Sequence, residues 1–126
     1  MSTRTVDFRE TVPLAQGVEV RKVCPITGYV AFVAMHFPPG TSGLVLVQLV
    51  HEKGGPGGAK TGILPTDADS SLALDDTTPI FNLHFPVSLG DYFFLRILNT
   101  DAGNPHTISV DMIIIAEVKV PILGEN

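Results

Sequence analysis

The sequence predicts an all-β protein of about eight antiparallel strands, packed as a sandwich with jelly-roll or related Greek-key connections. Ten prolines and twelve glycines divide the chain at short intervals, and the segments between them are rich in Val, Ile, Leu and Phe. No stretch of useful length repeats its apolar residues at the helical period of about 3.6 residues. An immunoglobulin-like sandwich is the next alternative, weakened by the absence of Trp and by the single Cys. A closed small barrel is the third.

Each predicted strand is an apolar run that ends at a turn signal. Pro38, Pro39 and Gly40 separate two strongly apolar runs, so the strands on either side of them are expected to pair as a hairpin. The Asn- and Asp-containing segment 99–105 is expected to join the last two strands in the same way. Residues 53–62 are predicted to form a flexible loop. The predicted strands are 6–12, 18–24, 28–37, 44–51, 71–74, 80–85, 92–99 and 106–120.

Length and charge limit the possible classes of protein. The chain has 126 residues, and 13 acidic against 8 basic residues give a net charge of −5. This length predicts one domain over 1–126, able to bury a core without disulfide or metal staples. The single cysteine excludes an internal disulfide framework. The scattered basic residues form no positive stripe, so nucleic acid is not expected as a partner.

The apolar runs and the N-terminus indicate where in the cell the protein is expected. The apolar runs are shorter than the roughly 20 residues that a membrane-spanning helix needs, so no membrane partner is expected. The polar N-terminus lacks the apolar run of a secretory signal. We therefore expect a cytoplasmic or particle-associated protein. Residues 1–12 are expected to form an N-terminal arm or a strand exchanged between subunits.

Several strands are apolar on both faces, which is more than the core of one small sandwich covers. The run 28–37 leaves almost no polar face, and 92–99 repeats this pattern. The strand 106–120 has one face that is polar at its ends but carries Ile113 and Ile115 in its middle. We therefore expect self-association. The predicted interface residues are Tyr29, Phe32, Met35, Tyr92, Phe94, Leu98, Ile113 and Ile115.

Residues 54–61, with the sequence GGPGGAKT, approach the phosphate-binding pattern G-x-x-x-x-G-K-[ST]. Ala59 stands where the second glycine belongs. A phosphate-binding loop opens a helix, whereas Gly62 and Pro65 follow here within five residues of Lys60. A surface loop between two strands is therefore the preferred interpretation.

An acidic stretch is the candidate metal site. Its carboxylate and hydroxyl oxygens are of the type that ligates Ca²⁺, but the spacing matches no EF-hand. The main interpretation is a solvated loop whose carboxylates bond turn backbones, and calcium is the alternative. The candidate ligands are Asp67, Asp69, Asp75 and Asp76.

Catalytic signals are sparse. Cys24 lacks the surroundings of a reactive thiol and is expected to be buried. Asp91 and Asp111 could form a carboxylate pair only across strands. The chain is therefore expected to be no enzyme and to hold no cofactor, a cupin-like enzyme being the weakest alternative. No histidine has a second zinc ligand two residues away on its strand face, which leaves isolated histidines at His36, His51, His84 and His106.

Two stretches resemble a known class of proteins. In 25–40 (PITGYVAFVAMHFPPG) and in 90–101 with 104–110, strand-like runs end in Pro/Gly turns or Asn-Asp loops. This texture resembles the small sandwich proteins that build or decorate virus and phage particles. The resemblance covers about half of the chain and contains no signature motif, so no functional residue carries over. It implies subunits that pack as trimers.

Together these observations predict a non-enzymatic structural protein. It would form a symmetric homo-oligomer, with a trimer as the first expectation. This oligomer would be the building block or surface decoration of a virus-like particle or filament. The alternative is a carbohydrate- or surface-binding module that uses the loops at 54–61, 67–76 and 100–105.

Overall fold

The computed structural model describes residues 2–66 and 70–117. Within these ranges the chain forms strands and no α-helix, so the described part contains no helix that could cross a membrane. The all-β prediction is confirmed. The described strands are β1 (Thr3–Val12), β2 (Gly17–Val23), β3 (Gly28–His36), β4 (Val45–Glu52), β5 (Lys60–Leu64), β6 (Ile80–Val87), β7 (Tyr92–Asn99) and β8 (His106–Ala116).

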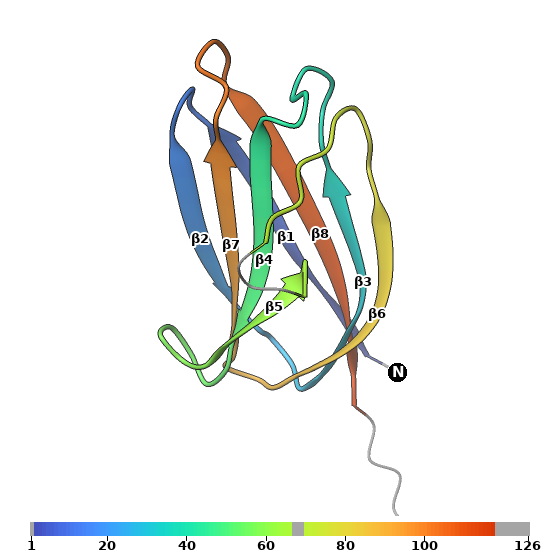
Figure 1. The fold of residues 1–126 in the computed structure, drawn as a ribbon. Coiled ribbons are helices and arrows are strands. Elements are labelled where there is room, and N and C mark those ends of the chain that lie inside the picture. The colour runs from blue at the N-terminus through green and yellow to red at the C-terminus, as the bar shows by residue number, and fades with distance from the viewer. Residues whose placement is uncertain (1, 67–69, 118–126) are drawn as a thin grey trace, which may run out of the picture.

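The described strands form two antiparallel sheets packed face to face (Figure 1). The first sheet has the order β1-β8-β3-β6, and the second has the order β2-β7-β4-β5. Consecutive strands alternate between the two sheets, except that β4 and β5 are neighbours within the second. This is the strand order of a jelly roll, so the predicted sandwich is confirmed in its more specific form.

The two hairpins expected from the turn signals are wrong. β3 pairs with β6 and β8 in the first sheet, whereas β4 pairs with β5 and β7 in the second. β7 and β8 also lie in different sheets. Positive φ angles at Gly40 and Gly43 do reverse the chain after β3. A turn signal shows where a chain reverses, but it does not show whether the next strand stays in the sheet or crosses to the opposite one.

The core lies between the sheets and takes alternate residues from each strand. In β8 the face predicted to be internal is buried from Ile108 to Ile114 and half-buried at Ala116, while the residues between are exposed or half-buried. β7 contributes one buried apolar set to the same core, but its alternation is less strict because Phe94 is buried as well. The buried residues of these two strands that the pattern correctly identified are Phe93, Leu95, Ile97, Ile108, Val110, Met112 and Ile114.

Two elements around the acidic stretch differ from the prediction. β5 was predicted as the end of a loop, but it pairs with β4 through Glu52↔Lys60 to Leu49↔Leu64. The predicted strand 71–74 is reduced to one bridge, in which Leu72 exchanges two backbone hydrogen bonds of 2.8 Å with Val47. Short segments acquire strand geometry from the neighbour they pair with, and the local sequence does not show that neighbour.

The N-terminal segment belongs to the first sheet of its own chain. β1 pairs with β8 from Thr3↔Ile115 to Val12↔His106, and Phe8 is buried in the core. The outward-facing residues of β1 are Thr, Asp and Arg, and such polar side chains suit a free sheet edge. Exchange of this strand between subunits stays a prediction. The last strand ends at Ala116, and the remainder of the predicted 106–120 run, from 118 on, lies outside the described residues.

Candidate functional site

The outer face of the first sheet carries a continuous apolar surface. The antiparallel register places Tyr29 beside Ile115 and Phe32 beside Ile113. All four side chains are half-buried in the single chain. Pro86 extends this surface onto β6, as the partner of Tyr29. We call the four residues Tyr29, Phe32, Ile113 and Ile115 the apolar strip; such contiguous apolar surface is typical of an interaction site.

A β-bulge brings Tyr29 and Phe32 onto the same face. The register of β3 shifts between Val30 and Phe32, so Ala31 is the extra residue. Strict alternation predicted that Tyr29 shares a face with Met35 and lies opposite Phe32. The bulge reverses this relation, and Met35 is fully buried in the core. The prediction of Met35 as an interface residue is therefore wrong.

The remaining predicted interface residues lie on the outer face of the second sheet. Tyr92 is half-buried there and Leu98 is 46% exposed. Phe94 is only 4% exposed, because the guanidinium carbon of Arg21 lies 3.9 Å from the centroid of its ring. The residues predicted to form one interface therefore lie in three places: one is in the core, and the others are on the two opposite outer faces of the sandwich. The four residues of the apolar strip are those that share one surface.

Two carboxyl groups lie beside the apolar strip. Asp7 of β1 is directly opposite Asp111 of β8. Partial burial, together with the hydrogen bond and the negative charge of Asp7, raises the pKa of Asp111. The carboxylate pair considered from the sequence, Asp91 with Asp111, is wrong, because Asp91 is bonded to His51 instead.

Replacement of Asp111 by Asn is expected to stabilise the folded chain by about 0.5 kcal/mol at pH 7, because it removes like-charge repulsion between cross-strand neighbours. A raised folded-state pKa means that stability rises as the pH falls from neutral through that pKa, so the advantage of the variant should disappear in acid. Urea denaturation at neutral and acidic pH measures both effects. Asp76→Asn, at an exposed position, is the control and should change neither value; an Asp111→Asn variant less stable than wild type would contradict the prediction.

A pocket of about 620 Å³ lies at the end of the sandwich where β3 begins and β4 ends. One of its walls holds His51 and Asp91, 6% and 4% exposed, with 2.7 Å between His51 Nε2 and Asp91 Oδ2. Asp91 also accepts hydrogen bonds from the backbone N–H groups of Gly54 and Ser88, each at 2.9 Å. We call this space the end pocket. The side chains that give it chemical character belong to Tyr29, His51, Lys53, His84, Asp91 and Glu117.

Asp91 is held in its ionised form. Burial alone would raise the pKa of Asp91, but the hydrogen bonds from Gly54, His51 and Ser88 outweigh burial and hold that pKa below its usual value. An ionised carboxylate only accepts hydrogen bonds, so the proton between the two side chains belongs to Nε2 of His51. The pair therefore fixes both the orientation and the tautomer of the imidazole.

The histidines are less isolated than the sequence predicted. His84 stacks on Tyr29, with ring centroids 4.0 Å apart, and lines the end pocket together with His51. His106 bonds Asp101 at 2.8 Å in the loop before β8. Sequence reasoning missed the His51–Asp91 pair because the two residues meet only through the β4–β7 register. Within the described ranges, no three His, Cys, Asp or Glu residues gather in a way that could hold a metal ion.

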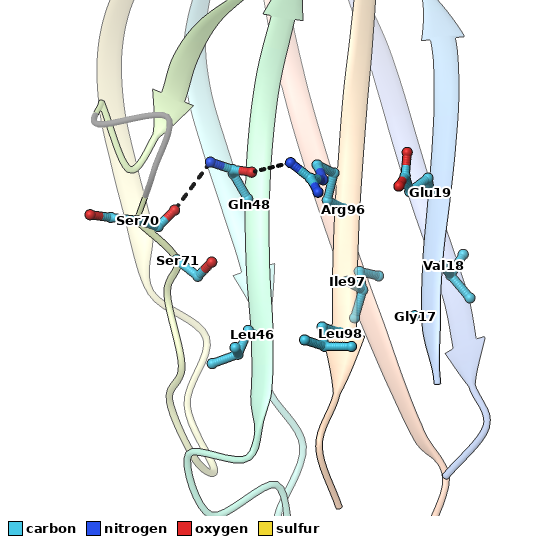
Figure 2. A pocket seen from close by; sticks show the side chains of 10 residues that line it. All are labelled: Gly17, Val18, Glu19, Leu46, Gln48, Ser70, Ser71, Arg96, Ile97 and Leu98. Carbon is cyan, nitrogen blue, oxygen red and sulfur yellow. Dashed lines mark hydrogen bonds between the residues drawn. The ribbon is translucent and has the colours of Figure 1, made fainter. Parts of the chain in front are cut away.

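A second hollow, of about 500 Å³, lies on the outer face of the second sheet. Figure 2 shows a polar row across it, in which Gln48 Nε2 donates to the carbonyl oxygen of Ser70 at 3.2 Å and Arg96 donates to Gln48 Oε1 at 3.5 Å. Leu46 and Leu98 add apolar surface beside the row. These polar groups bond one another, so this hollow is a weaker candidate than the end pocket.

One carboxylate of the acidic stretch, Asp75, bonds the backbone of the turn between β3 and β4. Asp75 Oδ1 accepts hydrogen bonds from the backbone N–H groups of Gly40 at 3.1 Å and Ser42 at 3.0 Å. The bond from Ser42 contributes most to lowering the pKa of Asp75. The expected turn-bonding role is therefore confirmed for this residue. Of the other calcium candidates, Asp76 is exposed, and Asp67 and Asp69 lie outside the described residues.

The glycine-rich segment forms the loop of the β4–β5 hairpin. A strand, β5, follows it directly in place of the helix that a phosphate-binding loop requires. The protein's own Glu52 occupies the loop: its Oε2 accepts from the backbone N–H of Gly57 at 2.9 Å, and its Oε1 accepts from Nε of Arg21 at 2.7 Å. Figure 1 places this loop and the 100–105 loop at opposite ends of the sandwich, so these two loops do not form one binding site.

Cys24 is fully buried, as expected, and its thiol donates to the carbonyl of Ile26 at 3.1 Å. Burial raises the pKa of the thiol. We expect iodoacetamide to modify Cys24 in the native protein at least about 100-fold more slowly than in urea, as measured by mass spectrometry. Equal rates in the two conditions would show that the site opens without unfolding.

Comparisons with known proteins assign this chain to no family. No family model and no curated protein matches the sequence. Among solved structures, a pilus protein of Bacillus endospore appendages is 14% identical with a TM-score of 0.47, over 92% of this chain and 88% of that chain. The mitogen derived from Yersinia pseudotuberculosis is 12% identical with a TM-score of 0.45, over 92% and 90% of the two chains.

A viral structure shows a similar degree of likeness. A chain of infectious bursal disease virus, Gx strain, is 13% identical with a TM-score of 0.46, over 95% of this chain and 33% of that chain. At these identities and TM-scores the likeness assigns no role to this chain.

Proposed function

We propose that this protein is a non-enzymatic structural subunit that associates with its own copies through the apolar strip. The expected product is a small symmetric oligomer, with a trimer as the first expectation, that builds or decorates a larger particle or filament. The observation that supports this is the apolar strip, in which two adjacent cross-strand pairs place large apolar side chains on the outside of a complete sheet.

The composition of this face suits an interface. A specific interface buries about 800 Å² on each partner, and the four half-buried side chains of the apolar strip supply only part of that area. The neighbouring outward residues of β1, Thr3 and Thr5, pair with Ile115 and Ile113 and would form a polar rim. An apolar centre with a polar rim is the usual anatomy of protein interfaces.

A second copy of the chain is the occupant that this face favours. Two residues beyond the Asp7–Asp111 pair, the same face carries Arg9 and His36, each paired with Ser109. The face therefore holds groups of both signs beside the apolar strip. A surface that binds its own copy must supply both partners of each polar contact, and groups of both signs on one face support such pairing.

The proposal of a non-enzymatic role is supported by the surroundings of the nucleophile candidates. The Cys24 thiol is buried and bonded to a carbonyl. Within the described residues, the bonded partner of the His51 ring is Asp91, and no hydroxyl or thiol is bonded to it. A histidine–carboxylate pair whose histidine bonds no hydroxyl or thiol lacks the contact that activates the nucleophile in a hydrolytic triad.

Replacement of Ile113 or Ile115 by Asp is expected to convert the oligomer to a monomer of 13.5 kDa. An unpaired carboxylate in an apolar contact loses its hydration, which should weaken association at least about 100-fold. Light scattering over a dilution series measures the mass, and far-UV circular dichroism confirms that each variant is folded.

The matched control is Leu89→Asp, which makes the same change at a side chain that is 67% exposed in the turn before β7. This variant should keep the mass of the wild type. A wild type that is monomeric at every concentration would contradict the proposal. So would full assembly of both Ile113→Asp and Ile115→Asp.

A further inference from the structure

The end pocket offers a hydrogen-bonding atom that the fold does not use. Nε2 of His51 donates to Asp91, and within residues 2–66 and 70–117 no hydrogen bond is made by the other ring nitrogen, Nδ1. Among the described residues, no buried side-chain nitrogen or oxygen lacks a partner, so Nδ1 is in contact with open space. His51 lines the end pocket, and that pocket is the space it reaches. In the neutral ring, Nδ1 is a fixed acceptor aimed at a ligand.

A flat ring surface lies on the same pocket. The rings of Tyr29 and His84 are stacked, with an interplanar angle of 29°, and both residues line the cavity. His84 is exposed and Tyr29 is half-buried. Each ring covers one face of the other, which leaves the opposite ring face and the polar ring edge for a ligand. Such a surface suits a ligand that has an apolar face and polar groups around its rim.

The charges around the pocket indicate a neutral ligand. Lys53 supplies a positive charge and a donor, while Glu117 and the ionised Asp91 supply negative charges, so the pocket does not favour an anion. The oxygens of Asp91 already accept bonds from His51, Gly54 and Ser88, which leaves no free inner carboxylate for a cation. The net charge of −5 disfavours an anion.

We propose that the end pocket is a binding site for a neutral carbohydrate. The ligand's hydroxyl groups both donate and accept, which matches the acceptor at His51, the donor at Lys53 and the acceptor at Glu117. The C–H face of a sugar ring would pack on the Tyr29–His84 surface. A volume of about 620 Å³ falls within the usual range for small-molecule sites. The end pocket shares Tyr29 and Ile115 with the apolar strip, so assembly through the strip would compete with ligand binding, whereas Phe32 and Ile113 belong to the strip alone.

The alternative role of the His51–Asp91 pair is purely structural. Asp91 holds the backbone of Gly54 and of Ser88, and so ties the β4–β5 loop to the β6–β7 turn. That role accounts for Asp91 but not for the open Nδ1 of His51. The chain contains its own comparison: His106 bonds Asp101 in the same manner at 2.8 Å, yet it lines neither the end pocket nor the hollow on the second sheet.

The test is a glycan array of neutral and acidic mono- and oligosaccharides, probed with the labelled full chain. Isothermal titration with the best-bound glycans then gives affinities. We expect the wild type to bind a group of neutral glycans. His51→Gln and His84→Ala should each weaken binding about tenfold or more, the value of one lost hydrogen bond or ring contact. His106→Gln is the matched control and should bind as the wild type does.

Three outcomes would overturn the proposal: no glycan bound by the wild type, a preference for acidic glycans only, or affinity unchanged in both His51→Gln and His84→Ala. His84 is exposed, so its variant keeps the test decisive if His51→Gln fails to fold. Ile113→Asp separates the two proposals, because Ile113 does not line the end pocket: the variant should abolish self-association and bind glycans at least as tightly as the wild type.

Discussion

Replacement of Gly28 by Ala should cost the folded protein about 3 kcal/mol of its free energy of unfolding. A Cβ atom at this position would lie 1.9 Å from the carbonyl oxygen of Ile115 and 2.9 Å from Cα of Ala116. These are backbone atoms of β8, the strand that pairs with Gly28, so no side-chain rotation relieves the clash. Relief requires the first residues of β3 to separate from the centre of the first sheet.

Urea denaturation followed by far-UV circular dichroism measures this loss, since the chain has no Trp for fluorescence. The matched control is Gly17→Ala in β2, where the nearest atoms to a new Cβ are the carbonyl oxygen of Ile97 at 3.4 Å and Leu98 Cδ1 at 3.5 Å. This control should be neutral or slightly stabilising, because alanine restricts the unfolded chain. Equal stabilities of the two variants would show that the start of β3 is free to move.

Replacement of Glu52 by Ala is expected to destabilise the protein by about 2 kcal/mol. The Glu52 carboxylate is fully buried and bonds Arg21 Nε at 2.7 Å and the backbone N–H of Gly57 at 2.9 Å. The side chain of Arg21 is 36% exposed, so solvent screens the pair and the loss should be smaller than for a fully buried ion pair. The loop of the β4–β5 hairpin should open first, because its N–H groups lose their acceptor.

The pH dependence of stability checks the same contact. Burial would raise the pKa of Glu52, but the hydrogen bonds from Arg21 and Gly57 and the charges of Arg21 and Lys60 hold that pKa below its usual range. A lowered folded-state pKa means that the unfolded chain binds the proton more tightly, so this contribution is fully present well above the ordinary pKa of a glutamate and is lost as the pH falls through the lowered folded-state pKa. Glu52→Gln should show a shallower loss of stability in acid than the wild type.

A double-mutant cycle with Arg21→Gln and Glu52→Gln isolates the pair. A coupling energy of about 1 kcal/mol is expected for a pair that is buried on one side only. Arg21→Gln alone should be the more damaging single change, since it leaves a buried carboxylate without its main partner. Additive single effects would mean that Glu52 acts through Gly57 and the loop alone.

The candidate site was predicted only in part, and the bulge in β3 shows why. Strict alternation correctly assigned Ile113 and Ile115 to the outer face of β8, because that strand keeps a regular period of two. The same rule failed for Met35, because one extra residue between Val30 and Phe32 exchanges the faces of everything that follows. The bulge is a feature of the pairing with β8 and β6, and the run of small and apolar residues in β3 gives no sign of it.

The end pocket was missed for a related reason. His51 and Asp91 approach each other because β4 pairs with β7 in the second sheet, and His84 meets Tyr29 because β6 pairs with β3 in the first. These pairings join segments distant in the sequence. The hydrogen bonds that form them are made by backbone groups, which are the same for nearly every residue. Side-chain patterns therefore give little information about which strands pair with each other.

By itself, the sequence determined that this chain folds as β-strands, where most of them begin and end, and which residues of β7 and β8 enter the core. Those properties follow from local chemistry: the period of apolar side chains and the backbone freedom of Gly and Pro. The tertiary structure decided that β3 and β4, and β7 and β8, lie in opposite sheets. It also decided that four of the predicted interface residues gather on one face. Both results depend on which backbones pair and on burial against distant strands, and these are properties of the whole chain.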